Sequence, residues 1–171
     1  AEALASADAL LQRREAALGD ARSASDQVIS GQALLRELRE IERRYLRERG
    51  NTLLEALGKE FESLHHHLES LARLPLGPGG KAPLERLQDA AARYGTALSD
   101  WRRMVAAGKR RELARAFPGF VRTLQQAADD MTSGLGQLAS DSERSVEKSL
   151  ESLRQARGYR ESLLQALLQH E

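Results

Sequence analysis

Two heptad runs, LEALGKEFESLHHHLESL at residues 54–71 and LERLQDAAARYGTALSDWRRMV at residues 84–105, flank the loop ARLPLGPGGKAP and decide the fold. Apolar side chains recur in both runs at strict spacings of three and four residues: Leu54, Leu57, Phe61, Leu64, Leu68 and Leu71, then Leu84, Leu87, Ala91, Tyr94, Leu98, Trp101 and Val105. This spacing places them on one narrow seam of each helix, which needs a partner helix to cover it. The two runs therefore predict an antiparallel helical hairpin.

The composition indicates that the rest of the chain is helical too. Of the 171 residues, 41% are hydrophobic and 30% are charged, whereas only 4% are aromatic, which is typical of long helices rather than sheets. The predicted fold class is all-α, an up-down-up-down four-helix bundle that forms a single domain over residues 1–171. Its helices are expected at about residues 3–49, 52–74, 84–108 and 119–170.

Glycine, asparagine and proline set the expected ends of the helices. Gly50 is expected to adopt the left-handed conformation that ends the first helix, and Asn51 or Thr52 to cap the second. Pro118 forbids a simple continuation of a helix. A turn is therefore expected somewhere between residues 108 and 119.

The two outer helices are predicted to be about twice as long as the inner ones. At about 1.5 Å per residue they span roughly 70–75 Å, against about 33–40 Å. Short loops make neighbouring helices antiparallel, which gives a four-helix head on a two-helix stem, with both chain ends at the free end of the stem. A polar seam in this stem favours a second protomer or a mobile connector, because the seam contains Ser23, Ser25, Ser140, Ser142, Ser145 and Ser149.

The chain begins and ends within its helical pattern, at AEALASADALL and LLQALLQHE. We therefore expect it to be a segment of a protein that crosses a membrane, folds outside and crosses back. The segment itself contains no apolar run near the roughly 20 residues of a membrane-spanning helix. It also begins without the features of a signal peptide.

Charge and missing motifs exclude several functional classes. Lys and Arg number 26 against 25 Asp and Glu, a net charge of +1, and the charges are interspersed, so we expect no nucleic-acid binding. Cysteine is absent, which excludes disulfides and thiol chemistry. No phosphate-binding loop, HExxH motif or other catalytic set is present. We therefore expect no catalysis and no cofactor in this segment.

Arginines supply the candidate ligand site. Five of them are expected at a similar height around the bundle seam, where guanidinium groups can hold a carboxylate or another anion: Arg36, Arg39, Arg43, Arg102 and Arg103. The alternative, which we favour, is that those of the first helix form surface ion pairs with nearby acids: Glu37, Glu40 and Glu42.

Three adjacent histidines invite a metal hypothesis: His65, His66 and His67. Neighbouring residues on a helix point about 100° apart, so the three cannot converge on one ion. A metal site would have to be completed by Glu62, Glu69 or a second protomer. A solvated polar face is the favoured interpretation.

The stretch LLRELREIERRYLRERGNTLLEAL, residues 34–57, resembles the end of the first extracellular helix in bacterial membrane sensors with helical input domains. In CHASE-type domains and QseE/GlrK-like sensor histidine kinases, a pattern of the kind L-x-x-E-R-x-x-R-x-Y-L-x-x-x-D precedes the turn into the second helix. The comparable places are occupied here by Leu38, Glu42, Arg43, Arg44, Tyr45, Leu46 and Asn51. The hairpin and the long return helix extend the likeness over nearly the whole chain, although RERGN replaces the short Gly-Asp turn of the family.

This resemblance implies a periplasmic signal-input domain of an inner-membrane receptor, usually a homodimer, that passes a small helix displacement to a sensor histidine kinase. The input domain of a methyl-accepting chemotaxis receptor would share the same fold. The helical pattern alone also suits a soluble coiled-coil scaffold or adaptor. A fourth alternative is a lipid-surface protein whose apolar faces open on a membrane, but narrow seams count against it.

Overall fold

The computed structural model describes residues 2–170, and these residues form four α-helices and no strand. The helices are α1 (Glu2–Glu48), α2 (Asn51–Ala72), α3 (Lys81–Ala107) and α4 (Arg110–Gln169). The prediction of an all-α fold is confirmed. The first three helices begin and end within three residues of their expected bounds, whereas α4 begins well before the expected residue 119.

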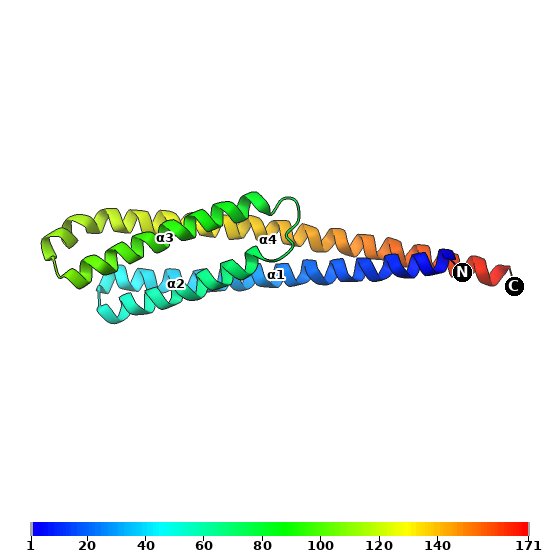
Figure 1. Cartoon of the computed structure of the whole chain (residues 1–171), viewed down its shortest axis with the longest axis horizontal. Coiled ribbons are helices and arrows are strands. Elements are labelled where there is room, and N and C mark those ends of the chain that lie inside the picture. Colours follow the sequence, from blue (N-terminus) through cyan, green and yellow to red (C-terminus); the bar gives the residue numbers. More distant parts are fainter. Residues whose placement is uncertain (1, 171) are drawn as a thin grey trace.

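The two long helices, α1 and α4, lie side by side along the length of the molecule (Figure 1). They run in opposite directions, because Asp8 of α1 lies 2.6 Å from Arg160 of α4 while Arg39 lies 2.7 Å from Asp129. α2 packs on α1 and α3 packs on α4, but α2 and α3 contact each other less than any other adjacent pair. The shorter helices cover only one end of the long pair. This four-helix part is called the head, and residues 2–18 and 150–169 are called the stem.

The hydrophobic core fills the head. Both heptad seams face it, since Leu57 and Leu64 of α2 and Leu87 and Tyr94 of α3 are each 0% exposed. The long helices complete the core with Val28, Leu35, Leu38, Tyr45, Phe120, Leu124, Met131, Leu135 and Leu138. Some seam residues lie at its margin and are only half-buried: Phe61, Leu84 and Val105. The heptad spacing therefore identified the core-facing side of α2 and α3.

The turn between α1 and α2 differs from the expectation. Arg49, not Gly50, adopts the left-handed conformation, with φ 54°, and Gly50 is extended. No side chain caps α2, and Asn51 is its first helical residue. Left-handed backbone is unfavourable for arginine, but the Arg49 guanidinium lies 3.4 Å from the centroid of the Phe117 ring. This cation–π contact offsets part of the strain.

The turn between α3 and α4 lies at residues 108–109, at the start of the range in which it was expected. Gly108 ends α3 with φ 69°, a left-handed conformation that glycine adopts without strain, and α4 follows at once. The expected helix start at residue 119 is wrong, because Pro118 lies inside α4. Proline removes one backbone hydrogen bond from a helix. Phe117 and Phe120 on either side of it pack against Trp101, with ring centroids 5.6 and 4.5 Å away, and this packing holds the segment helical.

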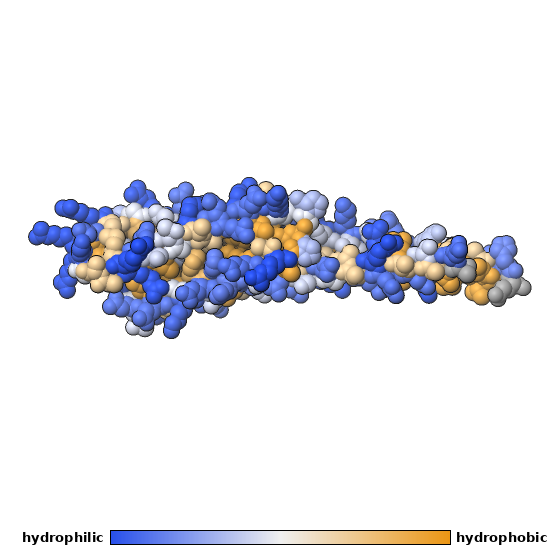
Figure 2. All heavy atoms as spheres, in the orientation of Figure 1, coloured by the Kyte–Doolittle hydropathy of each residue, from blue (hydrophilic) through white to orange (hydrophobic). Residues whose placement is uncertain are grey.

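The stem contains fewer large apolar contacts than the head. Figure 2 shows apolar and polar atoms interspersed on the surface of this part of the molecule. The buried residues of the stem are Ala7, Leu18, Leu153 and Ala156. The serines expected in the stem seam all lie outside residues 2–18 and 150–169, on the head side of the stem: Ser142 is buried, Ser25, Ser145 and Ser149 are half-buried, and Ser23 and Ser140 are exposed. Because burial of apolar area dominates folding free energy, most of the stability comes from the head.

Candidate functional site

The five candidate arginines do not form one cluster. Arg39 of α1 pairs with Asp129 of α4, at 2.7 Å, and Arg43 pairs with Glu40 within α1, at 3.3 Å. Arg36 is exposed. The remaining two, Arg102 and Arg103, line the groove between α2 and α3. The bundle thus divides the expected set between two different helix pairs, and only the Arg43–Glu40 contact matches the surface ion pairs favoured from the sequence.

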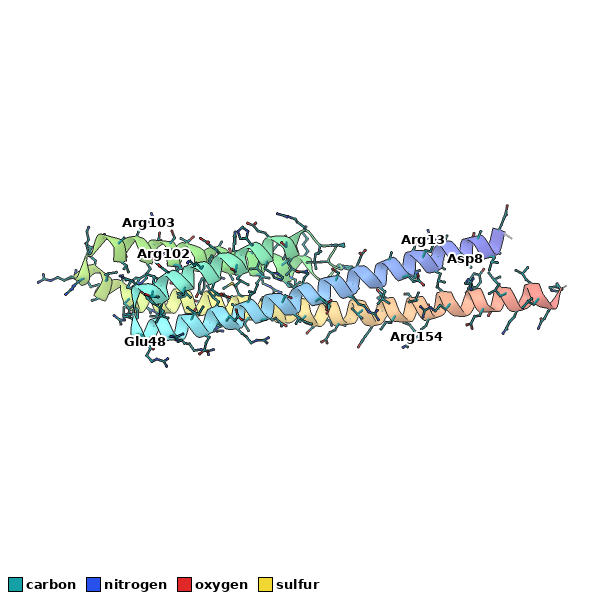
Figure 3. All side chains as sticks on the ribbon, turned by 90° about the horizontal axis from the view of Figure 1, so that it is seen from below. Asp8, Arg13, Glu48, Arg102, Arg103 and Arg154 are labelled. Atoms are coloured by element: carbon teal, nitrogen blue, oxygen red, sulfur yellow. The ribbon has the colours of Figure 1, made fainter. Side chains whose placement is uncertain are left out.

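Arg102 lies in the groove between α2 and α3, towards the end of the head away from the stem (Figure 3). Its guanidinium rests on the α2 backbone at Gly58, where a Cβ atom would lie 2.8 Å from Nη1. Phe61 of α2 fills the corresponding space on α3 at Gly95, where a Cβ atom would lie 2.8 Å from the ring. The two glycines therefore make room for a cation and an aromatic ring in a groove of about 520 Å³.

The charges in this groove are unequally paired. Arg103 forms an ion pair with Asp100 one helical turn before it, whereas no carboxylate of residues 2–170 lies within 4.0 Å of the Arg102 guanidinium. Glu62 also lines the groove and forms no ion pair within that part of the chain. The groove thus presents an uncompensated cation beside the ring of Phe61, with one carboxylate in the same groove.

The three histidines do not converge on one point, as their spacing on one helix predicts. His65 Nε2 lies 2.9 Å from one Glu69 carboxylate oxygen, and the mostly exposed His66 shares this neighbour, with its Nδ1 4.0 Å from the other oxygen, whereas His67 faces α1. His67 Nε2 lies 2.5 Å from the backbone carbonyl of Gln27 on α1, to which it can donate a hydrogen bond. Between residues 2 and 170 no three histidine, aspartate or glutamate side chains are placed to hold a metal ion.

Two buried polar pairs cross the head and were not expected. The Tyr94 hydroxyl of α3 donates to Glu42 Oε1 of α1 at 2.8 Å, and the Trp101 indole N–H donates to the Tyr45 hydroxyl at 2.6 Å. Glu42 is only 2% exposed, so its interpretation as a surface ion-pair partner is wrong. The signal was present in the sequence, because Glu42 lies four residues after Leu38 and three before Tyr45, on the same seam.

Burial raises the pKa of the Glu42 carboxyl above its ordinary value of 4.5. The hydrogen bond from Tyr94 and the positive charges of Arg39 and Arg43 oppose this shift without cancelling it. The folded protein therefore binds a proton at Glu42 more tightly than the unfolded chain does. Its contribution to stability is full below pH 4.5 and is lost as the pH rises through the folded pKa.

Replacing Glu42 with glutamine should remove this pH dependence. Glutamine keeps an oxygen that accepts from Tyr94 but cannot ionise, so the variant should gain stability relative to the wild type as the pH rises from 4.5 to 7. Urea unfolding at several pH values would measure the difference. Glu60→Gln should show a gain of the same sign, since burial and the neighbouring Glu37 also raise the pKa of Glu60. A Glu42→Gln difference that stays constant with pH would contradict the prediction.

A second groove of about 520 Å³ lies between α3 and α4 and is mainly apolar. The rings of Trp101 and Phe120 line it and stack with centroids 4.5 Å and planes 7° apart. Arg93 lies at its edge, but it already pairs with Asp130 at 2.9 Å and with Asp89 at 3.3 Å. Its cation is thus neutralised, whereas that of Arg102 in the first groove is not.

Comparisons with protein-family models, with curated proteins and with solved structures found no match to this chain. Among the described helices, none combines the length and the apolar character needed to cross a membrane. The choice of the groove between α2 and α3 as the candidate site thus rests on its geometry alone, in which Arg102 lies beside the Phe61 ring without an ion-pair partner among residues 2–170.

Proposed function

We propose that this chain is the extracytoplasmic signal-sensing domain of a transmembrane two-component sensor histidine kinase. In this proposal the chain is an up-down-up-down bundle in the periplasm, and its stem lies next to the inner membrane. A small molecule or a protein is the signal, and a homodimer is the working form. The segment itself is non-catalytic and needs no cofactor. The kinase lies beyond the membrane.

The observation that carries this proposal is the continuity of the two long helices. α1 and α4 each run without a break from the core of the head to the same end of the molecule (Figure 1). A helix transmits a displacement along its length because its backbone hydrogen bonds resist local deformation. A movement in the head can therefore reach the free end of the stem through both α1 and α4, which lie side by side.

The weak contact between α2 and α3 gives the head a way to move. α2 is joined to α1 through the short turn at residues 49–50, and α3 to α4 through residues 108–109. A signal that changes the separation of α2 and α3 would therefore change how α1 lies against α4. Such shifts of packed helices, by sliding or rotation, are an established class of switching movement.

Sequencing about 60 codons of the gene on each side of this segment would test the sensor-kinase proposal. Apolar spans on both flanks with a kinase module beyond them would support the proposal. A methyl-accepting module in place of the kinase would favour the chemotaxis receptor. Soluble flanks would overturn the proposal and favour the coiled-coil scaffold.

Insertions into the stem of the membrane-spanning protein should change its output with helical phase. One residue inserted after Leu150 of α4 rotates everything beyond it by about 100°, whereas seven residues restore the original phase to within about 20°. We expect the single insertion to change kinase output strongly and the seven-residue insertion to leave it near the wild-type level. Phosphorylation of the partner regulator in cells would be the measurement.

The matched controls are the same insertions in the loop at residues 73–80, which lies outside α1 and α4. These should have little effect on output, because the two long helices stay in phase. Equal outputs for one and seven residues in α4 would contradict transmission through the stem. Circular dichroism of each variant would show that the head remains folded.

A further inference from the structure

The groove between α2 and α3 has the properties of a built site rather than of an incidental gap. Gly58 and Gly95 both lie in helix interiors, where glycine destabilises a helix by about 1 kcal/mol relative to alanine. Alanine at residue 95 would press on the Phe61 ring, 2.8 Å from its Cβ, whereas alanine at residue 58 would displace the end of the flexible, exposed Arg102 side chain. Gly95 thus makes room for the Phe61 ring, and Gly58 lets the Arg102 guanidinium lie close to the α2 backbone.

No carboxylate of residues 2–170 lies within 4.0 Å of the Arg102 guanidinium, although Glu62 lines the same groove. A guanidinium forms its strongest contacts with a carboxylate or phosphate, which it can bind through two parallel N–H donors. Arg103, the next residue, is already paired with Asp100. Arg102 is therefore the group in this groove that is available to an anion from outside.

The other wall of the groove is apolar. The Phe61 ring stacks on Tyr94 and on His65, with centroids 5.2 and 6.0 Å apart, and Leu98 lies on the α3 side. A volume of about 520 Å³ is within the usual range for small-molecule sites. A flat apolar group would contact the part of the Phe61 ring that lines the groove while its charged end reached Arg102.

We propose that this groove binds a small aromatic carboxylate, with Arg102 as the charge partner and Phe61 as the apolar contact. The ligand bridges α2 and α3, the adjacent helices with the least contact of their own. Its role as the signal rests on the function proposed above, but its binding does not. Glu62, the carboxylate in the same groove, opposes an anion and limits its affinity.

Sodium benzoate is the probe, added to the ¹⁵N-labelled chain while amide resonances are recorded. We expect saturable shifts at Gly58 and Gly95, with Gly19 of α1 unaffected. Arg102→Met keeps most of the side-chain length without the charge and should weaken binding at least about tenfold, the effect of losing one charge-assisted contact. Glu62→Gln should strengthen binding.

Arg103→Met is the matched control, since Arg103 already pairs with Asp100, and it should change the affinity by less than about threefold. Benzamide, which has the same shape without the charge, should not produce saturable shifts. Absence of saturable shifts with benzoate, equal binding of benzamide, or an unchanged affinity in Arg102→Met would each overturn the proposal. Arg102 is exposed, so the variant should fold, and its melting temperature checks this.

The two proposals fail separately. Benzoate binding is measured on the chain alone, so it does not depend on any membrane or kinase. Benzoate binding without phase-dependent kinase output would support the proposed ligand site and contradict the proposed sensor function. Phase-dependent kinase output without benzoate binding would support the sensor function and contradict this groove as its ligand site.

Discussion

Replacing Trp101 with alanine should lower the free energy of unfolding by about 3–5 kcal/mol. Trp101 is 5% exposed, stacks on Phe120 and donates its indole N–H to the Tyr45 hydroxyl. Truncation leaves a cavity between α3 and α4 and a buried hydroxyl without its donor, and both effects destabilise the folded state. Urea unfolding followed by circular dichroism would measure the loss.

Trp101→Phe separates the two effects. Phenylalanine keeps a ring against Phe120 but has no N–H, so we expect a smaller loss of about 1–2 kcal/mol from the missing hydrogen bond and the smaller ring. Met104→Ala, at a half-buried position in the same groove, is a second reference. A Trp101→Ala loss no larger than that of Trp101→Phe would show that ring packing contributes little here.

The fold was predictable where a repeating pattern carried the signal. The spacing of Leu57, Leu64 and Leu71 repeats over three heptads, and a helix with such a seam has only one side that can face a core. The loop at residues 73–80 was equally clear, because consecutive prolines and glycines exclude a helix. Local sequence was sufficient in both cases, since the signal lies within the segment concerned.

The turns were less predictable because distant contacts decide them. Arg49 adopts the left-handed conformation beside a glycine that would do so more readily, and Phe117, far away in the sequence, provides the compensating contact. Pro118 stays within α4 because the flanking aromatic rings pack on Trp101. Propensity is a weak prior that tertiary packing overrides, as it does at both positions.

The candidate site was predicted only in part for a similar reason. Composition and spacing identified Arg102 and Arg103 as candidates, but they could not show which helix each guanidinium faces. Two glycines in helix interiors were the available signal for the groove, because such residues often mark a close approach of another group. Glu42 was recognisable as a seam residue from its spacing, and its charge led to the wrong surface assignment.

Replacing Leu64 with alanine should cost about 2–5 kcal/mol of unfolding free energy. Leu64 lies in α2 and is 0% exposed, within the same core cluster as Leu98 of α3, for which we expect a loss in the same range. Leu168→Ala in the stem is the matched control, because this leucine is 71% exposed and its truncation should change stability by less than about 0.5 kcal/mol.

The manner of unfolding in Leu64→Ala tests whether α2 is an integral part of the head. α2 has little contact with α3 and is attached mainly through α1, so it could detach before the rest unfolds. Its core residues nevertheless belong to one cluster with Trp101, the only tryptophan of the chain, and this favours a single cooperative transition. We therefore expect circular dichroism and Trp101 fluorescence to report the same midpoint. A loss of helix that precedes the fluorescence change would show that α2 unfolds alone. An unfolding midpoint that is unchanged in both Leu64→Ala and Leu98→Ala would contradict the packing of these side chains in the core.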